Sequence, residues 1–160
     1  MSRLFTALFL LSLSVAAYAQ HDGRQETAHL VVTAAPVSSP VAPGARVALR
    51  LDVAPKAKMH VYSPEQKDYI PVSLTIEKNP AITVLPAVFP KAEKYVFKAL
   101  DETQLVYSKP FQIVQNVTLA TSARAGDTIT VKGTFEYQAC DESVCFRPQK
   151  VSVSWTLTLR

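Results

Sequence analysis

The stretch that decides the fold lies near the C-terminal end and reads Val151-Ser152-Val153-Ser154-Trp155-Thr156-Leu157-Thr158-Leu159. Every odd-numbered position in it is apolar, and every even-numbered position carries a hydroxyl group. Successive side chains of a β-strand point to opposite faces, so a period of two predicts a strand with one buried face and one face in water. Such half-buried strands are typical of antiparallel sheets.

The same alternation recurs in three earlier segments, which share one apolar face each. They are Val47, Leu49, Leu51 and Val53; Val72, Leu74 and Ile76; and Ile129, Val131, Phe135 and Tyr137, with Gly133 in phase. Weaker strand candidates cover 30–34, 59–62, 82–85 and 111–119, and no segment has a convincing helical period. Eleven prolines punctuate the chain, many of them between strand candidates. About seven to nine short strands in about 130 residues predict an all-β fold, an immunoglobulin-like antiparallel β-sandwich.

The first residues differ from this pattern. Arg3 gives the start a positive charge, residues 4–17 are almost wholly apolar, and Ala17-Tyr18-Ala19 has small residues where a signal peptidase reads. The run is shorter than the roughly 20 residues that span a bilayer, so it predicts a signal peptide over 1–19, cleaved after Ala19. We expect a flexible segment over 20–28 and one domain over 29–160. We also expect no membrane span in the mature chain and a periplasmic, exported location that permits disulfides.

The charge is modest, with a formal net charge of +4 for the full chain. The basic residues are scattered singly or in short runs, without a basic stripe interleaved with aromatics. Nucleic acid is therefore not an expected partner, and ordinary surface charge explains the balance.

The chain has two cysteines, Cys140 and Cys145, in the stretch Tyr137-Gln138-Ala139-Cys140-Asp141-Glu142-Ser143-Val144-Cys145-Phe146-Arg147-Pro148. Four residues separate them, and both flanks alternate apolar and polar residues. A hairpin with a four-residue loop puts its flanking residues opposite each other, near disulfide distance. The spacing therefore predicts a Cys140–Cys145 disulfide across the mouth of a hairpin.

The purpose of this pair has three interpretations. A structural staple is weak here, because closing so small a ring stabilises the fold by only roughly 2 kcal/mol. A short exposed ring suits reversible opening, which favours a redox function. A zinc site needs four ligands, whereas His21, His29 and His60 are spread without metal-like spacing. Met59-His60 with the cysteines would suit copper(I), but nothing in the sequence brings them together. We expect no metal and no cofactor; redox function and staple both stay open.

The charges beside the cysteines refine the redox interpretation. Asp141 and Glu142 lie next to Cys140 and disfavour its thiolate, whereas Arg147 would favour a thiolate at Cys145. Phe146 and Pro148 would add an apolar edge and a stiff turn to a docking surface. The pair is therefore expected to exchange electrons with a docked partner rather than to act as a strong oxidant.

A long connection precedes the cysteine stretch. Residues 89–104 mix aromatics with charges, and loops of this length are often functional. The alternative is a further edge strand, Tyr95–Phe97, whose aromatic side chains only pack.

The cysteine motif Tyr137-Gln138-Ala139-Cys140 with Cys145-Phe146-Arg147-Pro148 resembles the N-terminal (alpha) domain of the thiol:disulfide interchange protein DsbD. Pro43-Gly44, His60-Val61-Tyr62 and Val106-Tyr107 support the resemblance, which covers roughly residues 30–158. It implies an immunoglobulin-like fold with the redox pair at one end, and a reductase-type thiol–disulfide oxidoreductase.

The resemblance also implies residue roles and partners. Cys145 would form the mixed disulfide and Cys140 would resolve it. Tyr95 or Phe97 in the long connection would cap the pair, and Tyr62 would pack near it. The implied partners are exported thioredoxin-like proteins, such as those of cytochrome c maturation.

The chain departs from the family in three ways. It has one residue fewer between the cysteines than the best-known members, Arg147 stands where proline is common, and no membrane or thioredoxin-like domain follows before Arg160. We therefore expect a stand-alone domain that a separate membrane protein supplies with electrons. The alternative function is a non-catalytic envelope adaptor with a structural disulfide.

Overall fold

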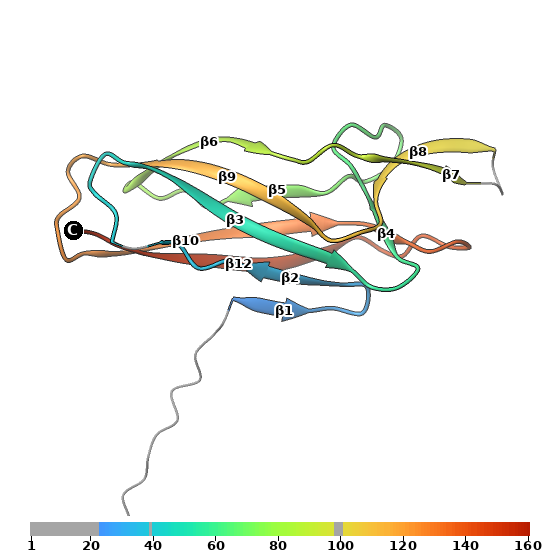
Figure 1. Cartoon of the computed structure of the whole chain (residues 1–160), viewed down its shortest axis with the longest axis horizontal. Helices are drawn as coiled ribbons and strands as arrows, with labels where there is room; N and C mark the ends of the chain where they lie inside the picture. Colours follow the sequence, from blue (N-terminus) through green and yellow to red (C-terminus); the bar gives the residue numbers. More distant parts are fainter. Residues whose placement is uncertain (1–22, 39, 98–100) are drawn as a thin grey trace, which may run out of the picture.

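Strands with one apolar face need a second layer to cover that face, and the computed structural model shows two such layers for residues 23–38, 40–97 and 101–160 (Figure 1). These residues contain twelve strands and no helix. In chain order the strands are β1 (Arg24–Glu26), β2 (Leu30–Ala34), β3 (Arg46–Pro55), β4 (His60–Tyr62), β5 (Ser73–Ile76), β6 (Ile82–Val88), β7 (Glu93–Phe97), β8 (Glu102–Tyr107), β9 (Phe111–Leu119), β10 (Thr128–Tyr137), β11 (Ala139–Cys140) and β12 (Gln149–Thr158).

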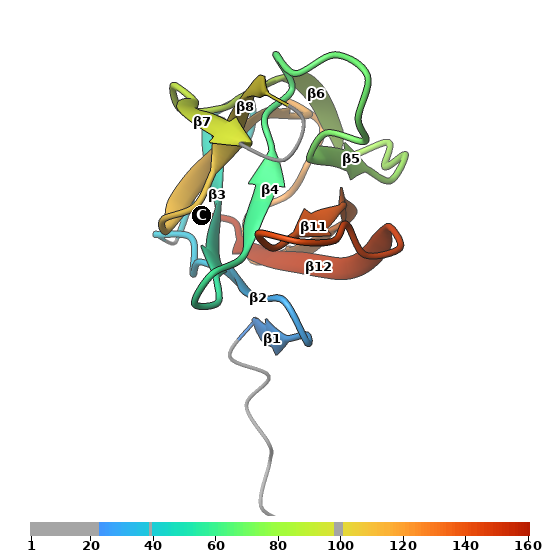
Figure 2. The same cartoon turned by 90° about the vertical axis from the view of Figure 1, so that its right-hand side faces the viewer.

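The strands form three sheets, and all pairs of named strands are antiparallel. A five-stranded sheet has the order β1-β2-β3-β9-β6, and a three-stranded sheet has the order β12-β10-β5. These two face each other as the layers of the sandwich. A four-stranded sheet, β11-β4-β8-β7, lies at one end, which faces the viewer in Figure 2. The immunoglobulin-like β-sandwich predicted from the alternation is therefore confirmed.

The core follows the alternation residue by residue. In β12, Val151, Val153, Trp155 and Leu157 are buried while the residues between them are exposed. In the facing sheet β3 repeats the pattern, and both strands contribute to one hydrophobic cluster. Gly133 in β10 has a packing role: a Cβ there would lie 2.9 Å from the Thr75 carbonyl oxygen. The glycine therefore lets β10 approach β5 closely.

Two elements differ from the sequence expectation, and a third decides between two stated alternatives. Within the segment expected to be flexible, Arg24–Glu26 form β1, whose exposed residues carry no apolar pattern but whose backbone pairs with the edge of β2. In the long connection the alternative of an edge strand at Tyr95–Phe97 is confirmed, because these residues lie in β7, which pairs with β8 at the edge of its sheet. The short strand β11 crosses to a second sheet. The predicted signal peptide lies outside the described residues, and within them no helix has the length and apolar character to cross a membrane.

Candidate redox site

The cysteine stretch leaves one sheet and joins another. The β10–β12 ladder ends at the pair Tyr137–Gln149, and residues 138–148 extend beyond it. Within this extension Ala139 pairs with Val61 and Cys140 pairs with His60, so β11 adds to the edge of β4. The extension therefore places Cys140 in the four-stranded sheet, where its strand β11 lies beside β4 at the end of the sandwich (Figure 2).

Cys140 and Cys145 face each other in an antiparallel bridge and form a disulfide, with their Cα atoms 4.0 Å apart. This confirms the pairing predicted from the spacing. The two sulfurs differ in access, because Cys140 is only 2% exposed whereas Cys145 is an exposed residue. An incoming thiol therefore has a route to Cys145 that the packing denies to Cys140.

Tyr62 on β4 presents its hydroxyl group to the disulfide. The oxygen lies 3.3 Å from Cys140 Sγ and 3.4 Å from Cys145 Sγ. A disulfide sulfur carries no hydrogen, so the hydroxyl is the donor in both contacts. Burial, with smaller contributions from Tyr69, Glu102 and Tyr95, raises the pKa of Tyr62 to about 12. The hydroxyl therefore keeps its proton at neutral pH and stays a donor to either sulfur.

A second tyrosine, Tyr69, packs against Tyr62 and fixes its position. The Tyr69 ring stacks on the Tyr62 ring with centroids 4.3 Å apart. The Tyr69 hydroxyl donates to Glu102 Oε2 at 2.7 Å, and Gln104 Nε2 donates to that hydroxyl at 3.2 Å. The hydrogen bond to Glu102, followed by burial, raises the pKa of Tyr69. This network on β8 fixes the position of Tyr69 and, through the stack, that of Tyr62.

His60 lies directly across from Cys140 in the β11–β4 ladder. It is 4% exposed, and its ring packs against Tyr62 at 5.8 Å and against Tyr95 at 4.8 Å. Burial lowers the pKa of His60, and the nearby Asp141 carboxylate partly opposes this. Its Nε2 atom is buried and has no hydrogen-bond partner among the residues that the structure describes.

A cavity of about 150 Å³ adjoins the disulfide. Its lining residues come from β4, β7, β8, the loop after β4 and the cysteine hairpin: His60, Tyr62, Tyr69, Phe97, Gln104, Cys140, Asp141, Ser143, Val144 and Cys145. Of the two aromatic cap candidates, Phe97 lines this cavity, whereas Tyr95 contacts the His60 ring at a tilt and packs against the cluster of Tyr62, Val106 and Cys140. Both therefore reach the site from the same face of β7.

The acidic loop closes on itself. Asp141 Oδ1 accepts hydrogen bonds from the backbone N–H groups of Ser143 at 2.7 Å and Val144 at 2.8 Å. The bonds from Val144 and Ser143 hold the pKa of Asp141 below its usual value. Glu142 and Arg147 are exposed and stand outside the cavity lining.

Phe146 does not join the apolar edge beside the disulfide. Its ring packs on the His29 ring, with centroids 4.4 Å apart, and does not line the cavity. Val144, which is 53% exposed, supplies apolar surface at the cavity instead.

Sequence reasoning did not single out four of the lining residues: Tyr69, Gln104, Ser143 and Val144. Tyr69 lies in a loop and Gln104 on the partner strand of β7, so no local pattern connects them to the cysteines. The sequence did contain a signal for His60, because it stands two positions before Tyr62 in a strand, and residues two apart in a strand point to the same face. No group of His, Cys, Asp and Glu placed to hold a metal ion occurs in the described part of the chain.

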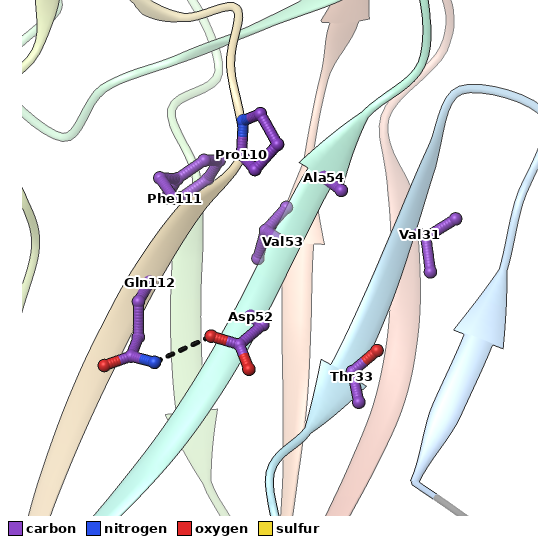
Figure 3. A pocket seen from close by; sticks show the side chains of 8 residues that line it. All are labelled: Val31, Thr33, Asp52, Val53, Ala54, Pro110, Phe111 and Gln112. Atoms are coloured by element: carbon purple, nitrogen blue, oxygen red, sulfur yellow. Dashed lines mark hydrogen bonds between the residues drawn. The ribbon is translucent and has the colours of Figure 1, made fainter.

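A second hollow lies on the outer face of the five-stranded sheet and is shown in Figure 3. It is lined by Val31, Thr33, Asp52, Val53, Ala54, Pro110, Phe111 and Gln112. Its one ionisable side chain, Asp52, accepts a hydrogen bond from Gln112 Nε2 at 2.7 Å (Figure 3). This hollow has no thiol, and its one carboxylate is hydrogen-bonded to a neighbouring amide.

The chain is similar to known proteins at two levels. Residues 26–156 match the family model described as thiol:disulfide interchange protein DsbD, N-terminal. No curated protein is significantly similar to the sequence. Among solved structures, the N-terminal periplasmic domain of ScsB from Proteus mirabilis superposes with a TM-score of 0.54 at 13% identity, over 83% of this chain and 49% of that one.

The reduced N-terminal domain of DsbD from Neisseria meningitidis gives a TM-score of 0.45 at 16% identity, over 66% of this chain and 74% of that one. The ScsB likeness supports the fold, and the family model spans most of the chain together with its disulfide. The chain therefore belongs to the family of N-terminal domains of the thiol:disulfide interchange protein DsbD, and its Cys140–Cys145 pair marks it as a thiol–disulfide exchange domain.

Proposed function

We propose that this chain is an exported electron-relay domain that passes reducing equivalents to or from thioredoxin-like proteins through a reversible Cys140–Cys145 disulfide. The observation that carries this proposal is the unequal access of the two sulfurs. Cys145 is exposed, whereas Cys140 is 2% exposed and pairs with His60 on β4. Thiol–disulfide exchange needs one sulfur that a partner reaches and a second that stays behind it.

The relay has two balanced steps in the direction of partner reduction. The Cys145 thiolate attacks a partner disulfide, forms a mixed disulfide and releases one partner sulfur as a thiolate, which takes up a proton. The Cys140 thiolate then attacks Cys145 Sγ, forms the internal disulfide and releases the second partner sulfur. The partner gains two electrons, and the chain loses two. The reverse sequence reduces this domain.

The aromatic side chains of β7 act as the cap in this proposal. Phe97 lines the cavity beside both cysteines, and Tyr95 covers the His60 ring behind it. β7 is the outer strand of the four-stranded sheet, and β7 and β8 lie at one end of the sandwich (Figure 1). A docking partner would displace these side chains to reach Cys145.

The location and electron supply follow from the same proposal. A signal peptide over 1–19 would deliver the domain to the periplasm, the compartment named for the similar ScsB domain. There a membrane protein would supply electrons, and thioredoxin-like proteins, including those of cytochrome c maturation, would accept them.

The test is a trap for the mixed disulfide. Reduced protein carrying Cys140→Ser is mixed with an oxidised thioredoxin-like protein, and adducts are resolved on a non-reducing gel. We expect a disulfide adduct with Cys140→Ser and none with the matched variant Cys145→Ser, whose remaining thiol is buried. A lack of adduct in both variants would contradict the proposal.

The reduction potential separates the relay from its alternative, an adaptor with a structural bond. Equilibration of the wild-type pair with a glutathione or dithiothreitol buffer measures it. A relay requires a potential above about −300 mV, and a value below that limit would identify a structural disulfide.

A further inference from the structure

Resolution of the mixed disulfide requires Cys140 to lose a proton in a buried place. The residue is 2% exposed, and burial disfavours the thiolate that must attack Cys145. Water has little access to this sulfur, so a side chain that accepts the proton would speed the step. The candidates are the polar groups that surround Cys140.

Most of these polar groups are unsuited to accept the proton. The Tyr62 hydroxyl is a donor, with its pKa raised to about 12. Asp141 Oδ1 accepts two backbone hydrogen bonds, and Glu102 Oε2 accepts bonds from Tyr69 and Gln104. Tyr62 keeps its own proton, Asp141 is a weak base because its pKa lies below the usual value, and Glu102 does not line the cavity beside Cys140.

His60 is different. It occupies the position opposite Cys140 in the β11–β4 ladder, where Cβ atoms of paired residues are typically about 4.5–5.5 Å apart. Both residues line the same cavity, so both side chains lie on the same face of the ladder. The ring is held by contacts with Tyr62 and Tyr95, yet its buried Nε2 has no partner among the described residues.

We infer that His60 is the proton acceptor for Cys140 during resolution of the mixed disulfide, and the proton donor to Cys140 in the reverse reaction. This inference rests on the proposed function, since it assigns a residue to one of its two steps. In the forward step the Cys140 S–H bond breaks and its proton goes to the imidazole. The sulfur forms a bond to Cys145 Sγ, the bond from Cys145 to the partner sulfur breaks, and the partner leaves as a thiolate. The imidazolium then returns the proton to solvent or to that thiolate.

The surroundings of His60 suit both halves of this cycle. Burial lowers its pKa, which leaves the ring neutral and able to accept a proton at neutral pH. The Asp141 carboxylate of the cysteine hairpin stabilises the imidazolium once it forms. The other titratable groups that face the ring are Tyr62 on its own strand, Tyr95 on β7 and Cys140 itself.

The experiment follows the two steps separately with dithionitrobenzoate, a small aromatic disulfide. Fully reduced protein is mixed with one equivalent in a stopped-flow instrument. Attack by Cys145 releases the first coloured thiolate, and attack by Cys140 releases the second. The Cys140→Ser variant identifies the phases, because it lacks the second one.

His60→Gln and His60→Phe both remove the base; the second also preserves the ring contacts, in case the first folds poorly. We expect the first phase to be unchanged and the second to slow by about tenfold or more at pH 7. In the variants, the rate of the second phase should also rise about tenfold per pH unit, because hydroxide takes the place of the imidazole as the base. The wild-type rate should level off once His60 is neutral.

His29→Gln is the matched control, because His29 is also buried but packs on Phe146 instead of lining the cavity. Its two phases should match those of the wild type. A second phase that His60→Gln and His60→Phe leave unchanged would overturn the inference, as would equal slowing of both phases. Absence of the first phase in the wild type would instead refute the proposed function.

Discussion

The Tyr62 hydroxyl offers a sharp test of how the site controls its thiolate. Tyr62→Phe removes one oxygen that lies 3.3 Å and 3.4 Å from the two sulfurs. The ring is 1% exposed and stacked on Tyr69, so the phenylalanine ring keeps the packing. The substitution therefore changes the hydrogen bond and very little else.

The size of the effect follows from the change in charge when a thiol ionises. A hydrogen bond to a charged group contributes about 1.5–3 kcal/mol and a neutral one about 0.5–1.5 kcal/mol, so the hydroxyl favours the Cys145 thiolate by about 1–1.5 kcal/mol. Its loss lowers the thiolate fraction by about five- to twelvefold. The remaining thiolate is more nucleophilic, which compensates in part, and the net result is an alkylation rate about threefold lower.

The assay uses Cys140→Ser protein, so that Cys145 is the single thiol. Iodoacetamide is added at pH 7, and intact mass is followed with time for the Tyr62→Phe protein and its parent. Tyr107→Phe is the control, because its hydroxyl donates to the Pro90 carbonyl oxygen at 2.7 Å rather than to a sulfur. An unchanged rate in Tyr62→Phe would refute the reasoning. A faster rate would show that the hydroxyl shields the sulfur instead of activating it.

Three further outcomes are expected. Phe97→Ala should speed reduction of the disulfide by dithiothreitol several-fold. Val96→Ala is the control, because Val96 lies on the other face of β7 and is 57% exposed, and it should leave the reduction rate unchanged. Equal reduction rates in the two variants would contradict a cap. Phe135→Ala should lower the free energy of unfolding by about 3–5 kcal/mol in urea titration, because the ring is 0% exposed. Val84→Ala, at 44% exposed, should cost under about 0.5 kcal/mol. The folded state lowers the Asp141 pKa below its ordinary 3.8, so its stabilisation is present above that pH and is lost as the pH falls through the folded value. Asp141→Ala should therefore reduce stability at pH 7, and its difference from the wild type should shrink as the pH falls below 3.8, as urea titrations across that range would show.

The long strands could be predicted from sequence because their burial alternates strictly. The predicted ranges 30–34 and 111–119 coincide with β2 and β9, and the apolar positions of β12 are buried as expected. The strand β1 could not be predicted in this way. Its three residues are all exposed, so backbone pairing alone, without an apolar face, defines it.

From the residues alone, the candidate site was predictable only where its chemistry is local, whereas the family resemblance also indicated Tyr62 and Phe97, which line the cavity. The spacing of Cys140 and Cys145 encodes their pairing, because a hairpin brings near neighbours together. The surroundings depend on how β4, β7 and β8 meet at the end of the sandwich. Neither the stack of Tyr69 on Tyr62 nor the access of Phe97 to the cavity has a periodic pattern, since each joins residues from different elements.

The turn that Asp141 closes has a consequence for speed. The Asp141 carboxylate binds two backbone N–H groups, and the Asp141 N–H donates to the Val144 carbonyl oxygen at 3.0 Å. None of these bonds involves sulfur, so the turn persists when the disulfide opens. The two thiols then remain neighbours at a high effective molarity, because the backbone order needed for ring closure is already in place. A mixed disulfide on this domain should therefore be short-lived, and its partner is released soon after it is captured.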